Sequence, residues 1–161
     1  MEPAHTNGQQ LSFEFSVGAP VMQLRLVRDI ARAYEPRTQV TSPEEVAAFL
    51  CDYFADKPVE EFLVVNLNTA NCVINIVTIS RGGLAASIVE PRAVFQAAIL
   101  SNAAAVILAH QHPSQNPEPS REDIRITRQL VEAGKLMGVP VHDHLICAGS
   151  TYTSLAERGL L

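Results

Sequence analysis

The sequence has no tryptophan, few aromatic residues and no excess of positive charge. Aromatic side chains make up 6% of its 161 residues, and the formal net charge at pH 7 is −5. Proteins that hold the phosphate backbone of a nucleic acid need a clustered basic surface. The composition therefore does not support nucleic acid as a partner, although a nucleic-acid-binding module with a local basic face stays a third hypothesis.

Cysteine pairs, a targeting segment and long apolar runs are also missing. The three cysteines lie far apart without a C-x-x-C pair, which argues against a thiolate zinc site and against a disulfide framework. The first ten residues, MEPAHTNGQQ, contain no basic region followed by an apolar one. No stretch reaches the roughly 18 apolar residues that span a membrane. We expect a soluble, cytoplasmic protein that has no membrane partner.

The chain has enough hydrophobic residues, 47%, to build the core of one domain. Residues 1–38 are predicted to form an N-terminal arm, partly disordered, with an amphipathic helix over residues 21–35. Residues 39–161 are predicted to form the domain itself. Helices and strands alternate along it, which favours an α/β or α+β sandwich with a mixed central sheet flanked by helices.

Apolar periodicity and turn residues place the expected elements of this domain. The helix around residues 91–102 is expected to bury Val94, Phe95, Ala98 and Ile99, and Leu136 is counted on the apolar face of the last helix. The run AAAVILA before His110 is typical of a strand buried on both faces. The full set comprises helices at 42–56, 91–102 and 120–137 and strands at 62–67, 72–80, 87–89, 103–109 and 139–149, with a last strand and helical turn within 150–161.

The segment HQHPSQNPEPSRED, residues 110–123, carries the most distinctive chemistry. Residues i and i+2 of an extended chain point the same way, so His110 and His112 present two imidazoles at the end of a strand. Ser120 and Asp123 have the spacing of a capping box at the start of a helix. Two imidazole nitrogens, a carboxylate oxygen and a position left to water make a catalytic zinc site. Spacing alone leaves two interpretations open, this metal site and a stiff surface turn.

These residues resemble the motif of the JAB/MPN metalloprotease superfamily, which is a distal glutamate, then His-x-His-Pro, then Ser-x-x-Asp. The matching segments are HQHP at 110–113 and SRED at 120–123. The chain is similar in particular to the RadC family, whose loop has the pattern HNHPSG-x-P-x-PS-x-x-D. The likeness covers about residues 42–161 and includes EEFLVVNLN, GGLAASIVEPRAVFQAAI, AAAVILAHQHPS and DHLICAG. It implies a JAB/MPN domain, a sandwich similar to that of cytidine deaminases.

The resemblance also implies roles for single residues. His110, His112 and Asp123 match the ligands of one zinc ion per chain, and Ser120 matches the serine that holds the water or the developing oxyanion. Glu60 matches the distal glutamate, which acts as general base. Its neighbour Glu61 stays an alternative, because the alternation of a strand sends only one of the two side chains into the site.

Several positions depart from the family pattern or lie beside the motif. Glu90 and Ala93 stand where the family usually has histidine and glutamate, so the surroundings of the site are in question. Gln111 replaces the common asparagine, and Gln115 replaces the common glycine. We expect the pair Asp143 and His144 to orient a ligand from a second shell of residues or, alternatively, to be hydrogen-bonded structure.

The leading hypothesis is a zinc-dependent hydrolase in which metal-bound water attacks an amide carbonyl. The superfamily implies a peptide or isopeptide substrate. The alternative is a non-catalytic JAB-fold module that serves as a binding or scaffold unit, associated with DNA repair or mobile elements. A homodimer is a possible assembly in either case.

Overall fold

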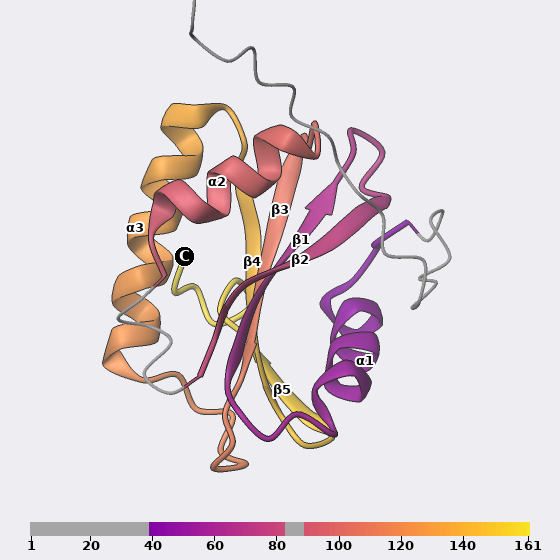
Figure 1. The fold of residues 1–161 in the computed structure, drawn as a ribbon, viewed down its shortest axis with the longest axis vertical. Coiled ribbons are helices and arrows are strands. Elements are labelled where there is room, and N and C mark those ends of the chain that lie inside the picture. The colour runs from indigo at the N-terminus through magenta and orange to yellow at the C-terminus, as the bar shows by residue number, and fades with distance from the viewer. Residues whose placement is uncertain (1–38, 83–88) are drawn as a thin grey trace, which may run out of the picture.

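The computed structural model describes residues 39–82 and 89–161 (Figure 1). The predicted arm at 1–38, its helix, and the first two residues of the strand predicted at 87–89 lie outside the described residues. The boundary between residues 38 and 39 therefore stays a prediction. Among the described residues, no helix combines the length and the apolar character needed to cross a membrane.

The described part of the chain contains three helices, at the places where the sequence predicts them. Helix α1 spans Pro43–Phe54 and α2 spans Pro91–Leu100, each with proline in the first turn, where the missing N–H costs no helical hydrogen bond. Helix α3 spans Arg121–Met137 and ends at Gly138, which takes the left-handed conformation with φ of 68°. Glycine adopts this conformation without the steric cost that a Cβ atom brings.

Within residues 39–82 and 89–161, five strands form one mixed sheet in the order β2-β1-β3-β4-β5. The pair β3 and β4 is parallel, and the other neighbouring pairs are antiparallel. The bounds are Glu61–Leu67 for β1, Val73–Arg81 for β2, Ala105–Gln111 for β3, Val141–Ala148 for β4 and Thr151–Ser154 for β5. The predicted α+β architecture with a mixed central sheet flanked by helices is confirmed.

Alternation along the strands divides the core into two layers. Helix α1 covers one face of the sheet, and α2 and α3 cover the other (Figure 1). Leu63 and Val65 of β1 pack toward α1, whereas Phe62 and Val64 pack toward α2 and α3. Strand β3 is buried along its whole length, as its uninterrupted apolar run predicts.

Two predicted core positions are wrong. Ile99 near the end of α2 is 53% exposed, and Leu136 near the end of α3 is 89% exposed. Both helices contact the sheet through other positions, which are Val94, Phe95 and Ala98 in α2 and Ile126, Thr127 and Leu130 in α3. Leu136 lies about 160° around α3 from the buried Gly134 and so points away from the sheet, because successive residues of a helix turn by about 100°. Ile99 lies at the edge of the apolar face of α2, one residue beyond the buried Ala98.

Candidate metal centre

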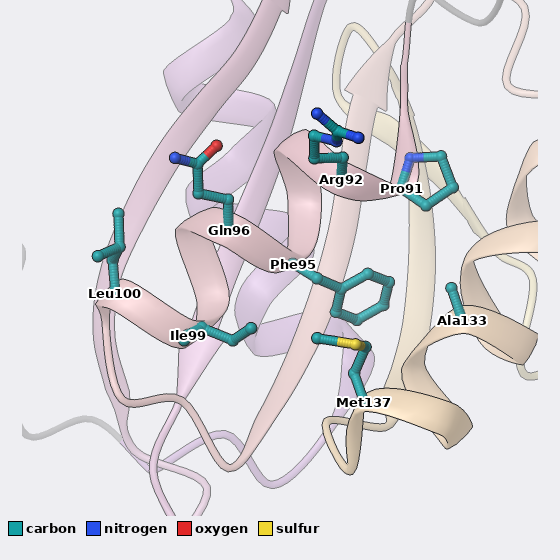
Figure 2. Close-up of a pocket in the computed structure, with 8 residues that line it drawn as sticks. All are labelled: Pro91, Arg92, Phe95, Gln96, Ile99, Leu100, Ala133 and Met137. Atoms are coloured by element: carbon teal, nitrogen blue, oxygen red, sulfur yellow. The ribbon is translucent and has the colours of Figure 1, made fainter. Parts of the chain in front are cut away.

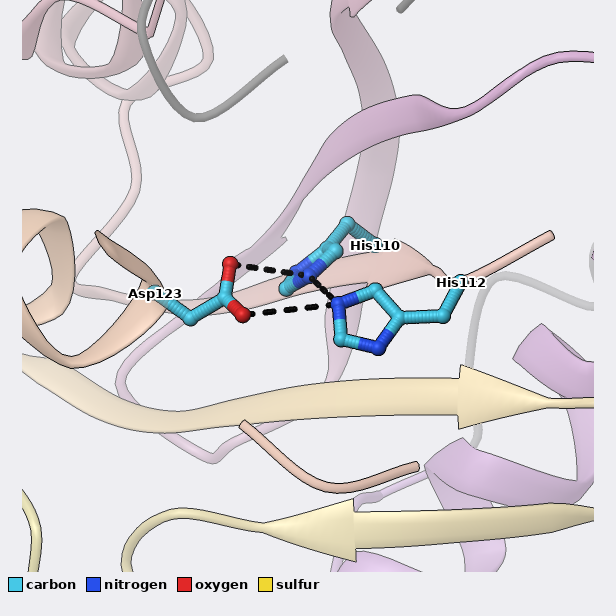
Figure 3. Close-up of side chains that lie close together, drawn as sticks. All are labelled: His110, His112 and Asp123. Atoms are coloured by element: carbon cyan, nitrogen blue, oxygen red, sulfur yellow. Dashed lines mark hydrogen bonds and ion pairs between the residues drawn. The ribbon is translucent and has the colours of Figure 1, made fainter. Parts of the chain in front are cut away.

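The end of β3 and the start of α3 bring the predicted ligands together. His110 is the penultimate residue of β3, His112 follows the strand, and Asp123 lies in the first turn of α3. The three side chains converge from these elements onto one point (Figure 3). Strand β3 is central in the sheet and α3 packs on the sheet. The hydrophobic core therefore fixes the positions of the two elements that carry the ligands.

The ligand atoms lie within a few ångströms of one another. Nε2 of His110 is 3.2 Å from Oδ1 of Asp123, and Nε2 of His112 is 3.4 Å from Oδ2. The two Nε2 atoms are 3.0 Å apart. One donor atom from each residue falls within 4.8 Å of the other two, so this group can hold a metal ion. His110 and Asp123 are buried, and His112 is partly exposed, which leaves one open side.

Asp123 is held by the capping box that the sequence predicts. Its Oδ2 accepts a hydrogen bond from the Ser120 backbone N–H at 2.7 Å, and its own N–H donates to Ser120 Oγ at 3.1 Å. Burial by itself raises the pKa of Asp123, but hydrogen bonds to His110 and His112 lower it further than burial raises it. The carboxyl pKa lies well below its ordinary range, so Asp123 is ionised at neutral pH.

His112 is oriented by the loop that follows it. Its Nδ1 lies 2.8 Å from the carbonyl oxygen of Asn116, which can only accept, so Nδ1 is the donor. Its Nε2 then points toward Asp123. The hydrogen bond with Asp123 is the main cause that raises the pKa of His112, with smaller contributions that include the Glu60 charge, while burial opposes them.

His110 is bonded on its other side to His144, which is fully buried in β4. Nδ1 of His110 is 2.9 Å from Nε2 of His144, and Nδ1 of His144 is 2.5 Å from Oγ1 of Thr127 in α3. Burial and the nearby His110 lower the pKa of His144 well below its ordinary value. His144 is therefore neutral near pH 7.

The donor set suits a cation. Both Nδ1 atoms have hydrogen-bond partners outside the group, so the two Nε2 atoms and the Asp123 carboxylate face one another. Nitrogen and oxygen atoms this close repel one another unless a proton or a metal ion lies between them. Nitrogen and carboxylate oxygen ligands in this combination match catalytic zinc.

Glu61 begins β1 and Glu60 directly precedes it, so strand alternation predicts that their side chains point to opposite sides of the sheet. The buried carboxylate of Glu61 accepts a hydrogen bond from Tyr53 of α1 at 3.1 Å and pairs with Arg81 at 3.2 Å. By alternation Glu60 shares the side of Phe62, which stacks on the ring of His110. Alternation therefore predicts that Glu60, rather than Glu61, is on the side of the metal group, and the Glu60 charge contributes to the raised pKa of His112.

Gln111 attaches the backbone on both sides of Glu60 to the end of β3. Its Oε1 accepts a hydrogen bond from the Glu61 N–H at 2.8 Å, and its Nε2 donates to the Val59 carbonyl at 2.6 Å. The sequence identified Gln111 only as a departure from the family asparagine. Its position between the two histidines of the motif is the only signal that could have found it.

Ser120 and Asp143 have structural contacts beside their predicted roles. Ser120 is exposed and is the N-cap of α3, with its hydroxyl toward the Asp123 amide. The carboxylate of Asp143 accepts from the His144 N–H at 2.6 Å and from Ser154 Oγ at 2.6 Å, and thus joins β4 to β5. Asp143 contacts only the backbone N–H of His144, whereas the ring of His144 itself contacts His110.

The loop between His112 and Ser120 contains no glycine, and side-chain contacts fix its conformation. Gln115 has φ of 61°, the left-handed region where the family glycine avoids steric cost. Its side chain lies over Gly149, where Oε1 would be 2.5 Å from an added Cβ atom. Arg158 forms two hydrogen bonds with the Glu118 carboxylate, at 2.7 and 2.9 Å, which attach the loop to the C-terminal turn.

A cavity of about 670 Å³ lies elsewhere, between α2 and the end of α3 (Figure 2). Arg92, Phe95, Ile99 and Met137 are among its lining residues, and none of the predicted site residues lines it. The metal group is at the opposite end of α3. We take the metal group, rather than this cavity, as the candidate functional site, because the cavity wall is mostly apolar and offers no set of metal ligands.

Comparison with known proteins gives a family match over most of the chain. The model of the RadC-like JAB domain matches residues 40–160. A UPF0758 protein of Salinibacter ruber is 61% identical over 130 residues, which cover 81% of this chain and 56% of that protein. One from Symbiobacterium thermophilum is 50% identical over 125 residues, which cover 78% of this chain and 53% of the relative. The chain thus spans about half the length of these two relatives.

Proposed function

We propose that this chain, which belongs to the RadC-like JAB domain family, is a zinc-dependent hydrolase that cleaves a peptide or isopeptide amide bond. The observation that carries the proposal is the convergence of His110, His112 and Asp123 within 4.8 Å. Each of the three comes from a different part of the β3-loop-α3 segment. Hydrogen bonds with Asn116, His144 and Ser120 orient them before any ion binds.

His110, His112 and Asp123 would hold one zinc ion through two Nε2 atoms and a carboxylate oxygen. A bound zinc ion would polarise the amide carbonyl and make water nucleophilic at neutral pH. The partly exposed side of His112 gives the substrate access, while the buried His110 and Asp123 keep bulk solvent from the opposite side. A site that excludes water strengthens the electrostatic interactions within it.

Glu60 would act as the general base. Its carboxylate would take a proton from the attacking water and pass it to the nitrogen of the leaving amine. This assignment is supported by the side of the sheet that Glu60 shares with Phe62 and by the effect of its charge on His112. The partners of Glu61 on the α1 face leave that carboxylate to a structural role.

Ser120 would support the oxygen of the substrate carbonyl. Its exposed hydroxyl at the start of α3 lies beside Asp123, where the positive end of the helix dipole favours developing negative charge. We further propose a cytoplasmic location, because Cys51, Cys72 and Cys147 are all free thiols, as suits a reducing compartment. Membrane and nucleic-acid partners form no part of the proposal.

A metal-binding module without catalysis is the second candidate. It is favoured by Glu90 and Ala93, which replace the histidine and glutamate usual in the family and stand exposed at the start of α2. Such a module would bind zinc at the same three residues and serve as a scaffold, and the chain would hydrolyse no amide.

A zinc-dependent hydrolysis screen with two matched variants tests the proposal. Zinc-loaded protein is incubated with peptide and isopeptide libraries, and cleavage is followed by mass spectrometry. Glu60→Gln should lower the rate about 10²- to 10⁴-fold while zinc binding persists, because only proton transfer is removed. Glu61→Gln should keep the activity and lower the melting temperature. Equal hydrolysis by Glu60→Gln and the unaltered protein would refute the base assignment. No cleavage of any substrate by zinc-loaded protein would favour the scaffold.

A further inference from the structure

Thr127 lies one helical turn after Asp123 and is 0% exposed. Its hydroxyl contacts two groups, the Asp123 carbonyl oxygen at 2.6 Å and Nδ1 of His144 at 2.5 Å. A threonine hydroxyl often bonds the carbonyl four residues earlier in a helix. This common hydrogen bond explains the first contact. The second contact, with a buried imidazole of a strand, is not explained by helix geometry.

The direction of each hydrogen bond follows from counting protons. The Thr127 hydroxyl has one hydrogen, and the Asp123 carbonyl can only accept, so the hydroxyl donates to that carbonyl. Nδ1 of His144 must then be the donor to Thr127 Oγ1. A neutral imidazole carries one N–H, and a charged one would be costly at a fully buried position. Nε2 of His144 is therefore an acceptor.

The same counting determines the tautomer of His110. Because Nε2 of His144 accepts, Nδ1 of His110 donates to it across 2.9 Å. The remaining nitrogen of His110, Nε2, keeps its lone pair and points toward Asp123 and His112. This is the nitrogen that a metal ligand needs free, since a protonated nitrogen cannot bind a metal ion.

The opposite arrangement of protons would block the site. If the Thr127 hydroxyl donated to His144 instead, Nε2 of His144 would carry its proton and donate to His110. Nε2 of His110 would then be protonated and would donate to the Asp123 carboxylate. The two arrangements differ in the orientation of one hydroxyl and in the tautomer of two rings, and only the first leaves three free ligand atoms.

We propose that Thr127 is a positioning residue that acts through His144 to hold His110 in the tautomer whose Nε2 can bind the metal. The proposal rests on the proposed zinc site and deepens it. Thr127 touches neither zinc nor substrate. Its contribution is an acceptor oxygen for the His144 N–H, which valine lacks and serine retains.

Zinc affinity of two Thr127 variants tests this role. Thr127→Val preserves the shape of the side chain and removes the acceptor, and it should weaken zinc binding about 10- to 100-fold, as loss of a group that orients a ligand does. Thr127→Ser should restore the affinity of the unaltered protein. Dissociation constants come from competition with a chromophoric chelator, and thermal unfolding of the metal-free variants checks their folding.

The ring protons can also be observed directly. In ¹⁵N-labelled zinc-loaded protein, the imidazole nitrogen shifts should show His110 and His144 both protonated at Nδ1. A proton on Nε2 of His144 would overturn the proposal, as would a Thr127→Val variant that binds zinc as tightly as the unaltered protein. If the unaltered protein bound no zinc, the proposed function would be refuted. The role of Thr127 would then be tested by the His144 tautomer of the metal-free protein. We predict Nδ1–H on His144 in that protein, and Nε2–H would refute the role of Thr127.

Discussion

Asp123 serves both the helix and the metal group. One carboxylate accepts the Ser120 N–H at the start of α3 and turns toward the nitrogens of His110 and His112. Truncation to alanine would therefore remove a helix cap and a ligand together. Substitution by asparagine keeps an oxygen for the cap and removes the charge, so Asp123→Asn separates the two contributions better.

Gln111→Leu should lower stability without affecting the metal group. The substitution keeps the volume but leaves the Glu61 N–H and the Val59 carbonyl without their buried partner. An unsatisfied buried group costs about 1–3 kcal/mol. Denaturant unfolding measures this loss, and zinc titration should give the affinity of the unaltered protein. A large drop in zinc affinity with unchanged stability would contradict the assigned role of Gln111.

The sequence predicted those residues whose relation is local. His110, His112, Ser120 and Asp123 lie within 14 residues, and strand alternation and helix capping determine how they face one another. The sequence does not reveal the role of Thr127, because its pattern does not distinguish a buried threonine on the apolar face of a helix from other core residues. Its partner His144 comes from β4, and only the packing of α3 on the sheet brings the two together.

Helices and strands follow from local chemistry at most positions. Proline at the start of α1 and α2, the capping box of α3 and Gly138 at its end all mark the boundaries that the structure shows. The exposed Ile99 and Leu136 show the limit of this reasoning. Periodicity groups apolar residues along a helix, whereas the packing of the neighbouring elements decides which of them are buried.

Gly134→Ala should destabilise the protein although alanine is the better helix former. A Cβ atom at this buried position of α3 would lie 2.6 Å from the Val139 carbonyl oxygen and 3.2 Å from the Phe95 ring. Helix propensity favours alanine by about 1 kcal/mol, but overpacking against backbone typically costs about 1–3 kcal/mol. We expect a net loss of stability on denaturant unfolding.

A second glycine provides the comparison for this substitution. Gly138 has positive φ and no atom within 4 Å of an added Cβ, so Gly138→Ala measures backbone strain without a clash. A Gly134→Ala variant at least as stable as the unaltered protein would show that α3 can move away from Val139.

The proposed zinc site would couple the stability of the whole molecule to pH. In the metal-free protein the pKa of His112 is raised above 6.5, chiefly by Asp123. That interaction stabilises the fold fully below the unfolded pKa and is lost as the pH rises through the folded pKa. Stabilisation by bound zinc would have the opposite pH dependence, because zinc must displace the proton. The rise in melting temperature caused by zinc should therefore be small at pH 6 and grow toward pH 8.

Thermal unfolding with and without zinc across this pH range checks the coupling. The exposed His142 lies outside the metal group, so His142→Gln should follow the unaltered protein at every pH. A zinc effect that is independent of pH, or larger at pH 6 than at pH 8, would be inconsistent with a site that contains His112.

Zinc titration of the metal-free protein tests the central claim most directly. Calorimetry on the unaltered chain, Asp123→Asn and the control His142→Gln gives stoichiometry and affinity together. The account predicts one zinc ion per chain for the unaltered protein and the control, and binding weaker by about tenfold or more for Asp123→Asn. A folded, unaltered protein that takes up no zinc, or one whose binding is untouched by Asp123→Asn, would contradict it.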